Sequence, residues 1–516
     1  MTARCPGLFT IAPNLCHNTA HKNRYRCVEG EEGMTRNTPA YSRLDFLVGG
    51  LLGLCGFFLY FWRLAVPAQY IYDEIYHAYT AAQFALGHKE AYEWWTTPPP
   101  PAVSYEWTHP PLSKLLMAVG ILTFGDNSFG WRIASVITGA LALFLFYLLA
   151  KALLRSRPVA VTATLLLMLD GLFMVQSRTA MNDIFVTAGL LAAYVFLMAY
   201  LRVPCLSRRA TGFLLAAAVC LGLGLASKWV AIYAIGGFGA IVAFRGLAAV
   251  FPVFRLRAAS AESDGTQVVL DTLSVGSVSQ EGQTQSAIGA VDVESDSGQA
   301  RSASVLGSLL TLLLQLVALV AIPAALYVAS YGQFFLMGHD LSQFVELQRQ
   351  MWWYHTNLVA THDYASRWWT WPLLGRPVWF YVDRTDTTIA NIYNLGNPLI
   401  WWPILPALVY LAYRYLRNAT WASAVILMGY LIQWLPWEAS PRIMFFYHML
   451  PSLPFGVLAL ASSLQQLWGR GKLSRRVVLT YLPLVVVSFI FFYPIWTGWP
   501  LSFDSFNLRI WVPSWR

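Results

Sequence analysis

Apolar residues fall in long runs that are separated by short polar segments. Each run approaches the 20 or so residues that an α-helix needs to cross the hydrocarbon core of a bilayer. The pattern therefore predicts an all-α polytopic membrane protein with about eleven transmembrane helices. The predicted spans are residues 45–64, 129–150, 158–176, 183–201, 211–227, 229–249, 304–330, 397–416, 419–437, 444–467 and 477–497.

Polar stretches divide these spans into two halves. Residues 252–303 are rich in Ser, Gly, Gln and acidic residues and almost free of aromatics, which predicts a disordered cytoplasmic insert. Two other stretches are dense in Trp, Tyr, His, Pro and acids, and we predict that they are external loops that carry function. The predicted organisation is a cytoplasmic tail 1–44 (over-called if Met34 is the true start), a half 45–251 with external loop 65–112, the insert, a half 304–497 with external loop 331–396, and an external segment 498–516.

Composition supports the membrane assignment and excludes several other classes. The chain has 516 residues, of which 57% are hydrophobic and 12% are charged. Soluble proteins carry about 25% charged residues, so this chain cannot cover several soluble domains with polar surface. The six cysteines include no C-x-x-C pair and none in the predicted external loops, which argues against a disulfide framework and a zinc site.

The net charge of +9 reflects orientation in the membrane and not nucleic-acid binding. Placing the N-terminus in the cytoplasm puts most of the 35 Lys and Arg residues on the cytoplasmic side, as the positive-inside rule requires. An odd number of spans then places the C-terminus outside. No soluble basic domain is present to grip a duplex.

The first external loop opens with an acidic motif, Tyr-Asp-Glu-Ile-Tyr-His, in which Asp73 and Glu74 are adjacent. On a helix Asp73 and His77 share a face, so that one can hydrogen-bond the other. An inert acidic turn at the membrane surface is the alternative. The loop ends with His109 and Lys114 before an apolar stretch that is too short to span and is predicted to lie in the interface.

Further charged residues recur near the external ends of later spans. Ionisable groups in a membrane are costly and face a partner or a cavity. If these groups converge, they form a site for an anionic lipid headgroup, with a cation on the phosphate and a carboxylate that handles a proton. The residues are Arg132, Arg178, Asp183, Lys228, Arg349 and Arg442.

A series of motifs gives the chain a resemblance to the protein O-mannosyltransferases. They are YDEIYHA, THPPLSKLL, GWRIASVITGAL, QSRTAMNDIF, GLASKWVAIYAI, LQRQMWWYH, ATHDYASRWWTWPL, GNPLIWWP and QWLPWEASPRIMFFYHMLP. They occur in the family's order between about residues 45 and 497. The resemblance implies the C-type glycosyltransferase fold. The second external loop is too short for the MIR domain of eukaryotic members, and the insert has no counterpart, so the chain resembles the shorter bacterial kind.

The resemblance implies an inverting transfer of mannose from a polyprenyl-phosphate donor to Ser or Thr hydroxyls of exported proteins. The acceptor hydroxyl must lose its proton as it attacks C1, and the departing phosphate must meet cations. Asp73 matches the family's acidic motif and is the expected base, with Glu74 as its neighbour and the two roles interchangeable. We expect no cofactor and no required metal ion.

The remaining candidates are assigned by the same resemblance. His77, His109, Lys114, Arg132, Lys228, Arg442 and His448 are candidates for binding the donor phosphate or sugar. Among them, His77 has the alternative role of orienting Asp73, Lys114 has the alternative of snorkelling at the interface, and Arg132 is expected to form a salt bridge that organises the acidic loop. Arg178, Asp183, Arg349, His362 and Trp371 are acceptor-binding or structural candidates, and Arg178 with Asp183 could close a buried pair.

Rival functions remain open at this level. One is a polyprenyl-phosphate-sugar transferase that acts on a lipid or a cell-wall glycan. Another is a transporter or a non-catalytic membrane assembly protein, although the halves show no internal repeat of the kind many transporters have. The expected partners are polyprenyl-phosphate-mannose, an exported polypeptide at the secretion translocon and the lipid bilayer. The expected location is the plasma membrane, with the active face outside.

Overall fold

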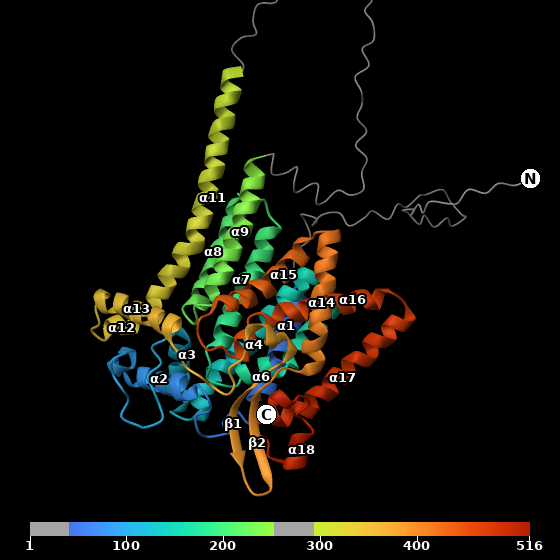
Figure 1. Ribbon diagram of the computed structural model, residues 1–516. Helices are drawn as coiled ribbons and strands as arrows, with labels where there is room; N and C mark the ends of the chain where they lie inside the picture. Colours follow the sequence, from blue (N-terminus) through green and yellow to red (C-terminus); the bar gives the residue numbers. More distant parts are fainter. Residues whose placement is uncertain (1–40, 252–293) are drawn as a thin grey trace, which may run out of the picture. The chain divides into compact units, whose positions relative to one another are not determined.

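The computed structural model describes residues 41–251 and 294–516. Within them the chain is mostly helical (Figure 1). The helices up to the insert are α1 (Arg43–Phe61), α2 (Glu74–Leu86), η1 (Lys89–Tyr92), α3 (Leu112–Phe124), α4 (Ser128–Leu154), α5 (Arg157–Met168), α6 (Gly171–Gln176), α7 (Asp183–Leu201), α8 (Arg208–Leu225) and α9 (Ala231–Val250). After it come α11 (Glu294–Ser330), α12 (Gly332–Leu336), α13 (Leu341–Asn357), η2 (Trp368–Leu373), α14 (Pro398–Arg417), α15 (Trp421–Trp434), η3 (Leu435–Ala439), η4 (Phe446–Met449), α16 (Leu453–Gly469), α17 (Lys472–Thr497), α18 (Phe503–Asn507) and η5 (Pro513–Trp515).

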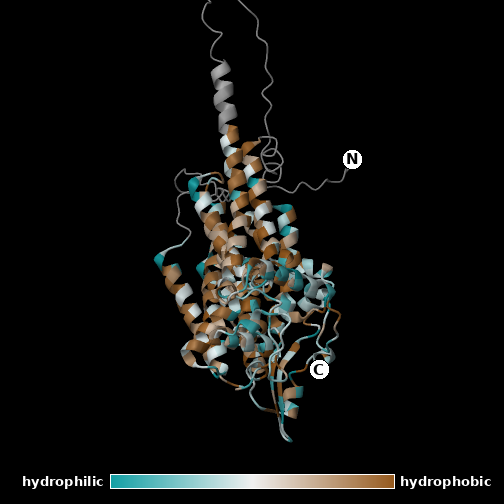
Figure 2. Ribbon diagram, turned by 90° about the vertical axis from the view of Figure 1, so that its left-hand side faces the viewer, coloured by the Kyte–Doolittle hydropathy of each residue, from teal (hydrophilic) through white to brown (hydrophobic). Residues whose placement is uncertain are grey.

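Eight described helices are long and apolar enough to cross a membrane: α1, α4, α7, α8, α9, α11 from Val305, α14 and α17. Each coincides with a predicted span, and apolar residues dominate them in Figure 2. The three remaining predicted spans are shorter helices. The span at 158–176 is divided into α5 and α6 at Asp170, whose side chain accepts the Phe173 N–H as the N-cap of α6. The spans at 419–437 and 444–467 become α15 and α16, each followed or preceded by a 3-10 turn.

Two predicted boundaries differ from the structure, and one predicted tail is packed. α1 begins at Arg43, because Ser42 forms a capping box with Asp45. Residues 294–303 belong to α11 and not to the insert, whose other residues, like the tail 1–40, lie outside the described part of the chain. The predicted C-terminal segment 498–516 is folded onto the predicted second loop: the Trp515 indole is buried and its Nε1 donates to the Leu374 carbonyl at 2.6 Å.

A small antiparallel sheet lies in the predicted second loop and is an addition to the all-helical prediction (Figure 1). Strands β1 (Val378–Arg384) and β2 (Thr388–Asn394) form a hairpin, and β3 (Leu501–Ser502) pairs with β2. The pairing of β1 with β2 is irregular between Trp379 and Tyr381. Phe380 therefore sits at the bulge, and it is the β1 residue that reaches the acidic motif. The bulge was not visible in the sequence pattern.

Close packing of α4 fixes the first external loop against the bundle. α4 packs on α1, α3 and α7. At Gly139 a Cβ atom would lie 2.5 Å from Ser177 Oγ, so only glycine permits this approach. The approach brings Arg132, about one helical turn from the start of α4 at Ser128, next to the turn between α6 and α7. The acidic motif lies between these two elements.

The short apolar helix predicted at the end of the first loop is present as α3. It has 13 residues and is too short to cross a bilayer alone. One side, with Met117 and Ile121, is buried, whereas Val119 and Leu122 are exposed. This two-sided character is what an interfacial helix needs, because its apolar outer face would contact acyl chains.

Candidate active site

The acidic motif begins with a strained backbone turn at Tyr72. The side chains of Asp73 and Glu74, which follow it, meet different partners. Tyr72 adopts φ 45°, a left-handed conformation that a bulky residue rarely takes and that costs about 1–3 kcal/mol. Its ring stacks on Phe380 of β1, with centroids 4.5 Å apart and planes within 6°. The contact holds the turn in place. Strain of this kind concentrates at functional sites.

Glu74 is fully buried and its carboxylate is saturated with hydrogen bonds. Arg132 Nε donates to Oε1 at 2.8 Å and Nη2 donates to Oε2 at 2.7 Å. The backbone N–H groups of Ala180 and Ile71 donate to the two oxygens at 3.0 and 3.1 Å. The salt bridge predicted for Arg132 is therefore present. Because every lone pair is directed at the protein, Glu74 has no oxygen left for a substrate.

Arg132 is occupied in the same way. Its remaining N–H groups donate to the carbonyls of Leu64, Pro67 and Gln69, at 3.1, 2.7 and 3.0 Å. These carbonyls belong to the segment that joins α1 to the acidic motif. Arg132 therefore fixes that segment, and its geometry does not favour the predicted phosphate contact.

Asp73 has the opposite environment. It is the N-cap residue of α2, yet its side chain makes no capping hydrogen bond. Tyr447 Oη donates to Asp73 Oδ2 at 3.3 Å, and Oδ1 receives no hydrogen bond from any described residue. Burial raises the pKa of Asp73 above its ordinary value, against the opposing effects of His77, Tyr447 and Lys228. A carboxylate with one free oxygen and a raised pKa is suited to accept a proton.

The three predicted residues His77, His109 and Lys114 converge on Glu106, a carboxylate that sequence reasoning missed. Lys114 Nζ is hydrogen-bonded to Glu106 Oε2, and it also donates to the Glu106 carbonyl at 2.5 Å. His109 Nδ1 lies 2.8 Å from Oε1, and His77 Nδ1 lies 3.5 Å from Oε2. His77 thus contacts Glu106 and Asn182, at 3.3 Å, rather than forming the predicted hydrogen bond to Asp73. The only signal in the sequence was a glutamate three residues before His109.

The ion pair between Glu106 and Lys114 sets the charges of this cluster around Glu106. Burial raises the pKa of Glu106, but Lys114 and His109 outweigh it and hold that pKa well below its usual range. Burial lowers the pKa of His109 well below its ordinary value, so that the imidazole is neutral near pH 7. Lys114 is buried, and its Nζ is bound to the Glu106 carboxylate and to two carbonyls, that of Glu106 and, at 2.9 Å, that of His109. It neither snorkels nor has a donor N–H free for phosphate.

Asp183 pairs with Lys228. The buried pair with Arg178 that the sequence suggested for Asp183 does not form. Lys228 Nζ donates to Asp183 Oδ1 at 2.8 Å. Arg178 instead donates to the carbonyls of Tyr60 and Trp62, both at 2.6 Å, and so caps the end of α1. Asp183 and Lys228 can pair because α7 packs against α8. Asp183 is the first residue of α7, and Lys228 follows the end of α8, in the turn before α9.

Two cationic groups lie near Tyr447, the hydrogen-bond partner of Asp73. Lys228 Nζ lies 5.6 Å from the centroid of the Tyr447 ring, whose hydroxyl contacts Asp73. Arg442 is hydrogen-bonded through Nη1 to His355 Nδ1, and its Nε is buried without a hydrogen-bond partner among the described residues. An arginine without a carboxylate partner, in a partly buried site, is a ready anion ligand.

His355 completes this side of the site and was not among the predicted residues. Its Nε2 lies 2.8 Å from the Thr108 carbonyl, so Nε2 carries the proton and Nδ1 faces Arg442 as an acceptor. Burial, with help from Arg442, lowers the pKa of His355 to about 4. The imidazole is therefore neutral at pH 7 and orients the guanidinium without adding charge.

The last four predicted residues lie farther from Asp73 or are structural. His448 is buried, with its Nδ1 2.8 Å from the Phe445 carbonyl and its ring stacked near Trp371. Trp371 is fully buried, which excludes it from stacking on a sugar. His362 is exposed, with its ring 6.2 Å from that of Tyr72, and remains at the mouth of the site.

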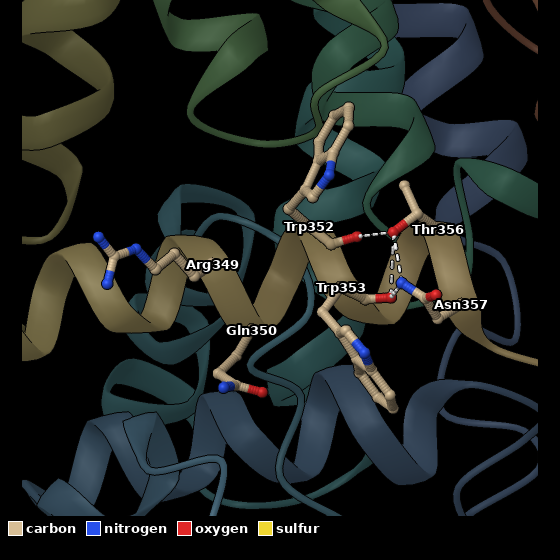
Figure 3. A pocket seen from close by; sticks show the side chains of 6 residues that line it. All are labelled: Arg349, Gln350, Trp352, Trp353, Thr356 and Asn357. Carbon is tan, nitrogen blue, oxygen red and sulfur yellow. Dashed lines mark hydrogen bonds between the residues drawn. The ribbon is translucent and has the colours of Figure 1, made fainter.

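Arg349 lies on the other side of α13 from the site. Its side chain is 74% exposed and makes one ion pair, at 3.4 Å, with Glu346. It lines a surface groove with Trp352, Trp353 and three polar residues of the same helix. Figure 3 shows that Trp352 and Trp353 leave the helix in opposite directions. Arg349 therefore does not join Lys228 and Arg442.

One end of the bundle of membrane-spanning helices thus presents an aspartate with one free oxygen, a lysine paired with Asp183 and an arginine without a carboxylate partner, an arrangement suited to proton transfer beside an anionic leaving group. Comparison with known proteins identifies the family. Residues 50–337 match the model "Dolichyl-phosphate-mannose-protein mannosyltransferase", and residues 340–515 match the "C-terminal four TMM region of protein-O-mannosyltransferase". The chain belongs to the protein O-mannosyltransferase family.

Curated relatives and a solved structure agree with this assignment. The chain is 29% identical to a polyprenol-phosphate-mannose–protein mannosyltransferase of Mycobacterium tuberculosis, and 27% identical to the Corynebacterium glutamicum protein of the same name. Each match covers 79% of this chain and 81% of the relative. The fold matches the Saccharomyces cerevisiae Pmt1–Pmt2 complex bound to the sugar donor, with a TM-score of 0.70 at 15% identity over 93% of both chains.

Proposed function

We propose that this enzyme transfers mannose from polyprenyl-phosphate-mannose to Ser or Thr hydroxyls of exported polypeptides, with Asp73 as the base. The observation that carries the proposal is the free Oδ1 of Asp73, whose hydrogen-bond partner Tyr447 lies near both Lys228 and Arg442. Glu74, which is fully engaged by Arg132 and backbone N–H groups, is a structural neighbour and not an alternative base.

In the proposed reaction, residues of the site accept the proton of the acceptor and stabilise the leaving phosphate. The acceptor oxygen forms a bond to C1 of mannose, its proton passes to Asp73 Oδ1, and the bond from C1 to the phosphate oxygen breaks. The lipid phosphate leaves with the electron pair of that bond. Arg442 and Lys228 would stabilise its charge, and Arg442 is the stronger candidate because Lys228 already has Asp183 as a partner.

No cofactor is needed for this sequence of bond changes, since proton acceptor and cations are supplied by the chain. We further propose that the enzyme acts at the plasma membrane with its site outside, on polypeptides that emerge from the secretion translocon. The distribution of Lys and Arg supports this orientation. Membership of the family favours a glycosyltransferase over a transporter or an assembly protein.

The proposal is tested by transfer of radiolabelled mannose from polyprenyl-phosphate-mannose to a peptide rich in Ser and Thr, with protein purified in detergent. Asp73→Asn should lower kcat by about 10²–10⁴-fold, because general-base catalysis is lost, while bound donor is retained. Asp126→Asn is the matched control, since Asp126 is exposed and lies outside the site. Equal rates for wild type and Asp73→Asn would exclude Asp73 as the base.

The acceptor is tested separately. Label that enters the peptide supports protein mannosylation. Label that enters only added lipid or cell-wall glycan would replace the acceptor in the proposal and leave the reaction type unchanged.

A further inference from the structure

Tyr447 joins the proposed base to the nearest ion pair. It lies in the 3-10 turn η4, which directly precedes α16. Its hydroxyl donates to Asp73 Oδ2 at 3.3 Å, and its ring faces Lys228 Nζ, 5.6 Å from the centroid. Lys228 is in turn bound to Asp183. One side chain thus connects the first external loop with the ends of α7 and α8.

The position of Tyr447 is fixed by its neighbours and not by Asp73. It is buried, and its ring is stacked parallel to that of Phe445, with centroids 5.6 Å apart and planes within 7°. Phe380 and Tyr72 contact it edge-on, at 6.1 and 6.0 Å. A ring held on three sides presents its hydroxyl at one place, so Asp73 must turn to meet it.

Two facts show why such a fixed donor matters at this carboxylate. Asp73 does not cap its own helix, so the usual hydrogen bond that orients an N-cap aspartate is missing. With Oδ2 held by Tyr447, Oδ1 is the oxygen that remains open. A carboxylate without that donor can rotate about its Cβ–Cγ bond, and the oxygen that meets the acceptor is then no longer defined.

We propose that Tyr447 is a positioning residue for the base: its hydroxyl holds Asp73 Oδ2, aims Oδ1 at the acceptor hydroxyl and favours the ionised carboxylate. The inference rests on the proposed role of Asp73. Tyr447 itself touches neither sugar nor acceptor in this arrangement, so its effect passes through Asp73.

The ionisation of Asp73 has several other determinants, which the test must hold constant. Burial raises the pKa of the carboxyl, and Tyr447 is one of the groups that lower it. The charged or titratable groups that act on Asp73 are Tyr72, Tyr76 and His77 from its own segment, Glu106 from the first loop, Lys228 from the turn before α9, Tyr354 from α13 and Tyr447 from η4. Tyr447→Phe removes a single oxygen and leaves all the others in place.

The sign of the effect follows from the charge of the base. Asp73 accepts a proton only when it is ionised, so the rate rises with pH through the pKa of Asp73 and is constant above it. Loss of a donor to the carboxylate disfavours the ionised form and raises that pKa. In Tyr447→Phe the acidic limb of the pH–rate profile should therefore move upward by about 0.5–1 pH unit, and kcat on the plateau should fall by about 3–10-fold.

The experiment measures pH–rate profiles and donor KM for wild type, Tyr447→Phe and Tyr481→Phe. Tyr481 of α17 is the matched control, because its hydroxyl lies outside the site, where it donates to the Leu399 carbonyl at 2.7 Å. The expected result is an upward shift of the acidic limb in Tyr447→Phe alone, with donor KM changed less than about twofold. An unmoved limb in a Tyr447→Phe protein that binds donor would overturn the inference.

Two further measurements separate this result from other failures. Retention of labelled donor by the purified variant shows that it is folded. If donor binding is lost, Tyr447→His, which restores a ring N–H donor, is measured in the same way. Its acidic limb should coincide with that of the control, and a limb that moves upward although the N–H donor is restored contradicts the inference. Wild-type protein that transfers no mannose would refute the proposed function instead. The two failures are thus distinguishable.

Discussion

At the scale of single residues, two adjacent carboxylates have opposite fates because their oxygens meet different partners. Glu74 receives two N–H groups of Arg132 and two backbone N–H groups, whereas Asp73 receives one hydroxyl. A buried carboxylate with all its lone pairs used is fixed and charged but chemically silent. A partly buried one with a free oxygen can take a proton.

The saturated pair predicts that Glu74→Gln acts on stability. The substitution leaves the Arg132 guanidinium buried without a counter-ion and should lower the free energy of unfolding by about 3–5 kcal/mol. Glu346→Gln is the matched control, because Glu346 pairs with Arg349 at the surface and should change stability by about 0.5 kcal/mol or less. Thermal unfolding in detergent measures both. A melting temperature of Glu74→Gln equal to that of the control would contradict the structural assignment.

At the scale of elements, the helices are tied together by polar contacts between segments far apart in the chain. Asp170 shows this most clearly. It caps α6 through the Phe173 N–H at 3.0 Å, and its Oδ2 accepts the Asn397 N–H at 2.9 Å and Trp401 Nε1 at 2.8 Å. One carboxylate thereby joins α6 to the start of α14.

Asp170→Asn should destabilise this junction. Whichever way the amide is turned, its NH₂ group faces at least one N–H donor that the carboxylate had accepted, so the expected loss is about 2–4 kcal/mol. Asp340→Asn is the matched control, since Asp340 is an exposed N-cap of α13 and asparagine caps helices equally well. Thermal unfolding of the two variants side by side measures the difference. Loss of stability in both variants alike would show that the effect is not specific to the junction.

At the scale of the whole molecule, the described charged residues around the candidate site are mostly paired or bound to carbonyls, and Arg442 stands apart. Glu74 pairs with Arg132, Asp183 with Lys228 and Glu106 with Lys114. Because an unpaired charge is expensive in an apolar setting, the position without a carboxylate is where a ligand's charge is expected.

The proposed orientation of the molecule gives a prediction of its own. In a background whose six cysteines are replaced by serine, a cysteine at Thr387, at the exposed tip of the β1–β2 hairpin, should react with a membrane-impermeant maleimide on intact cells. A cysteine at Lys472, exposed at the start of α17, should react only after the cells are opened. The reverse labelling pattern would invert the topology.

The family, the membrane-spanning helices and the acidic motif could be read from the sequence, because they depend on local pattern. A run of about 20 apolar residues is the same signal wherever its helix packs. A salt bridge between Arg132 and the acidic loop was also predicted, although the sequence did not say which acid would be its partner. The hairpin was missed, because its apolar and polar residues alternate irregularly across the bulge at Phe380.

Which acid is free, by contrast, was decided only by the tertiary structure. Glu74 is bound by Arg132 and Ala180, 58 and 106 residues away, and Asp73 by Tyr447, 374 residues away. The partner of Lys228 and the role of Glu106 were fixed in the same way. Apolar periodicity sets where helices cross the membrane, but hydrogen bonds between distant side chains depend on how those helices pack, and packing carries no local signal in the sequence.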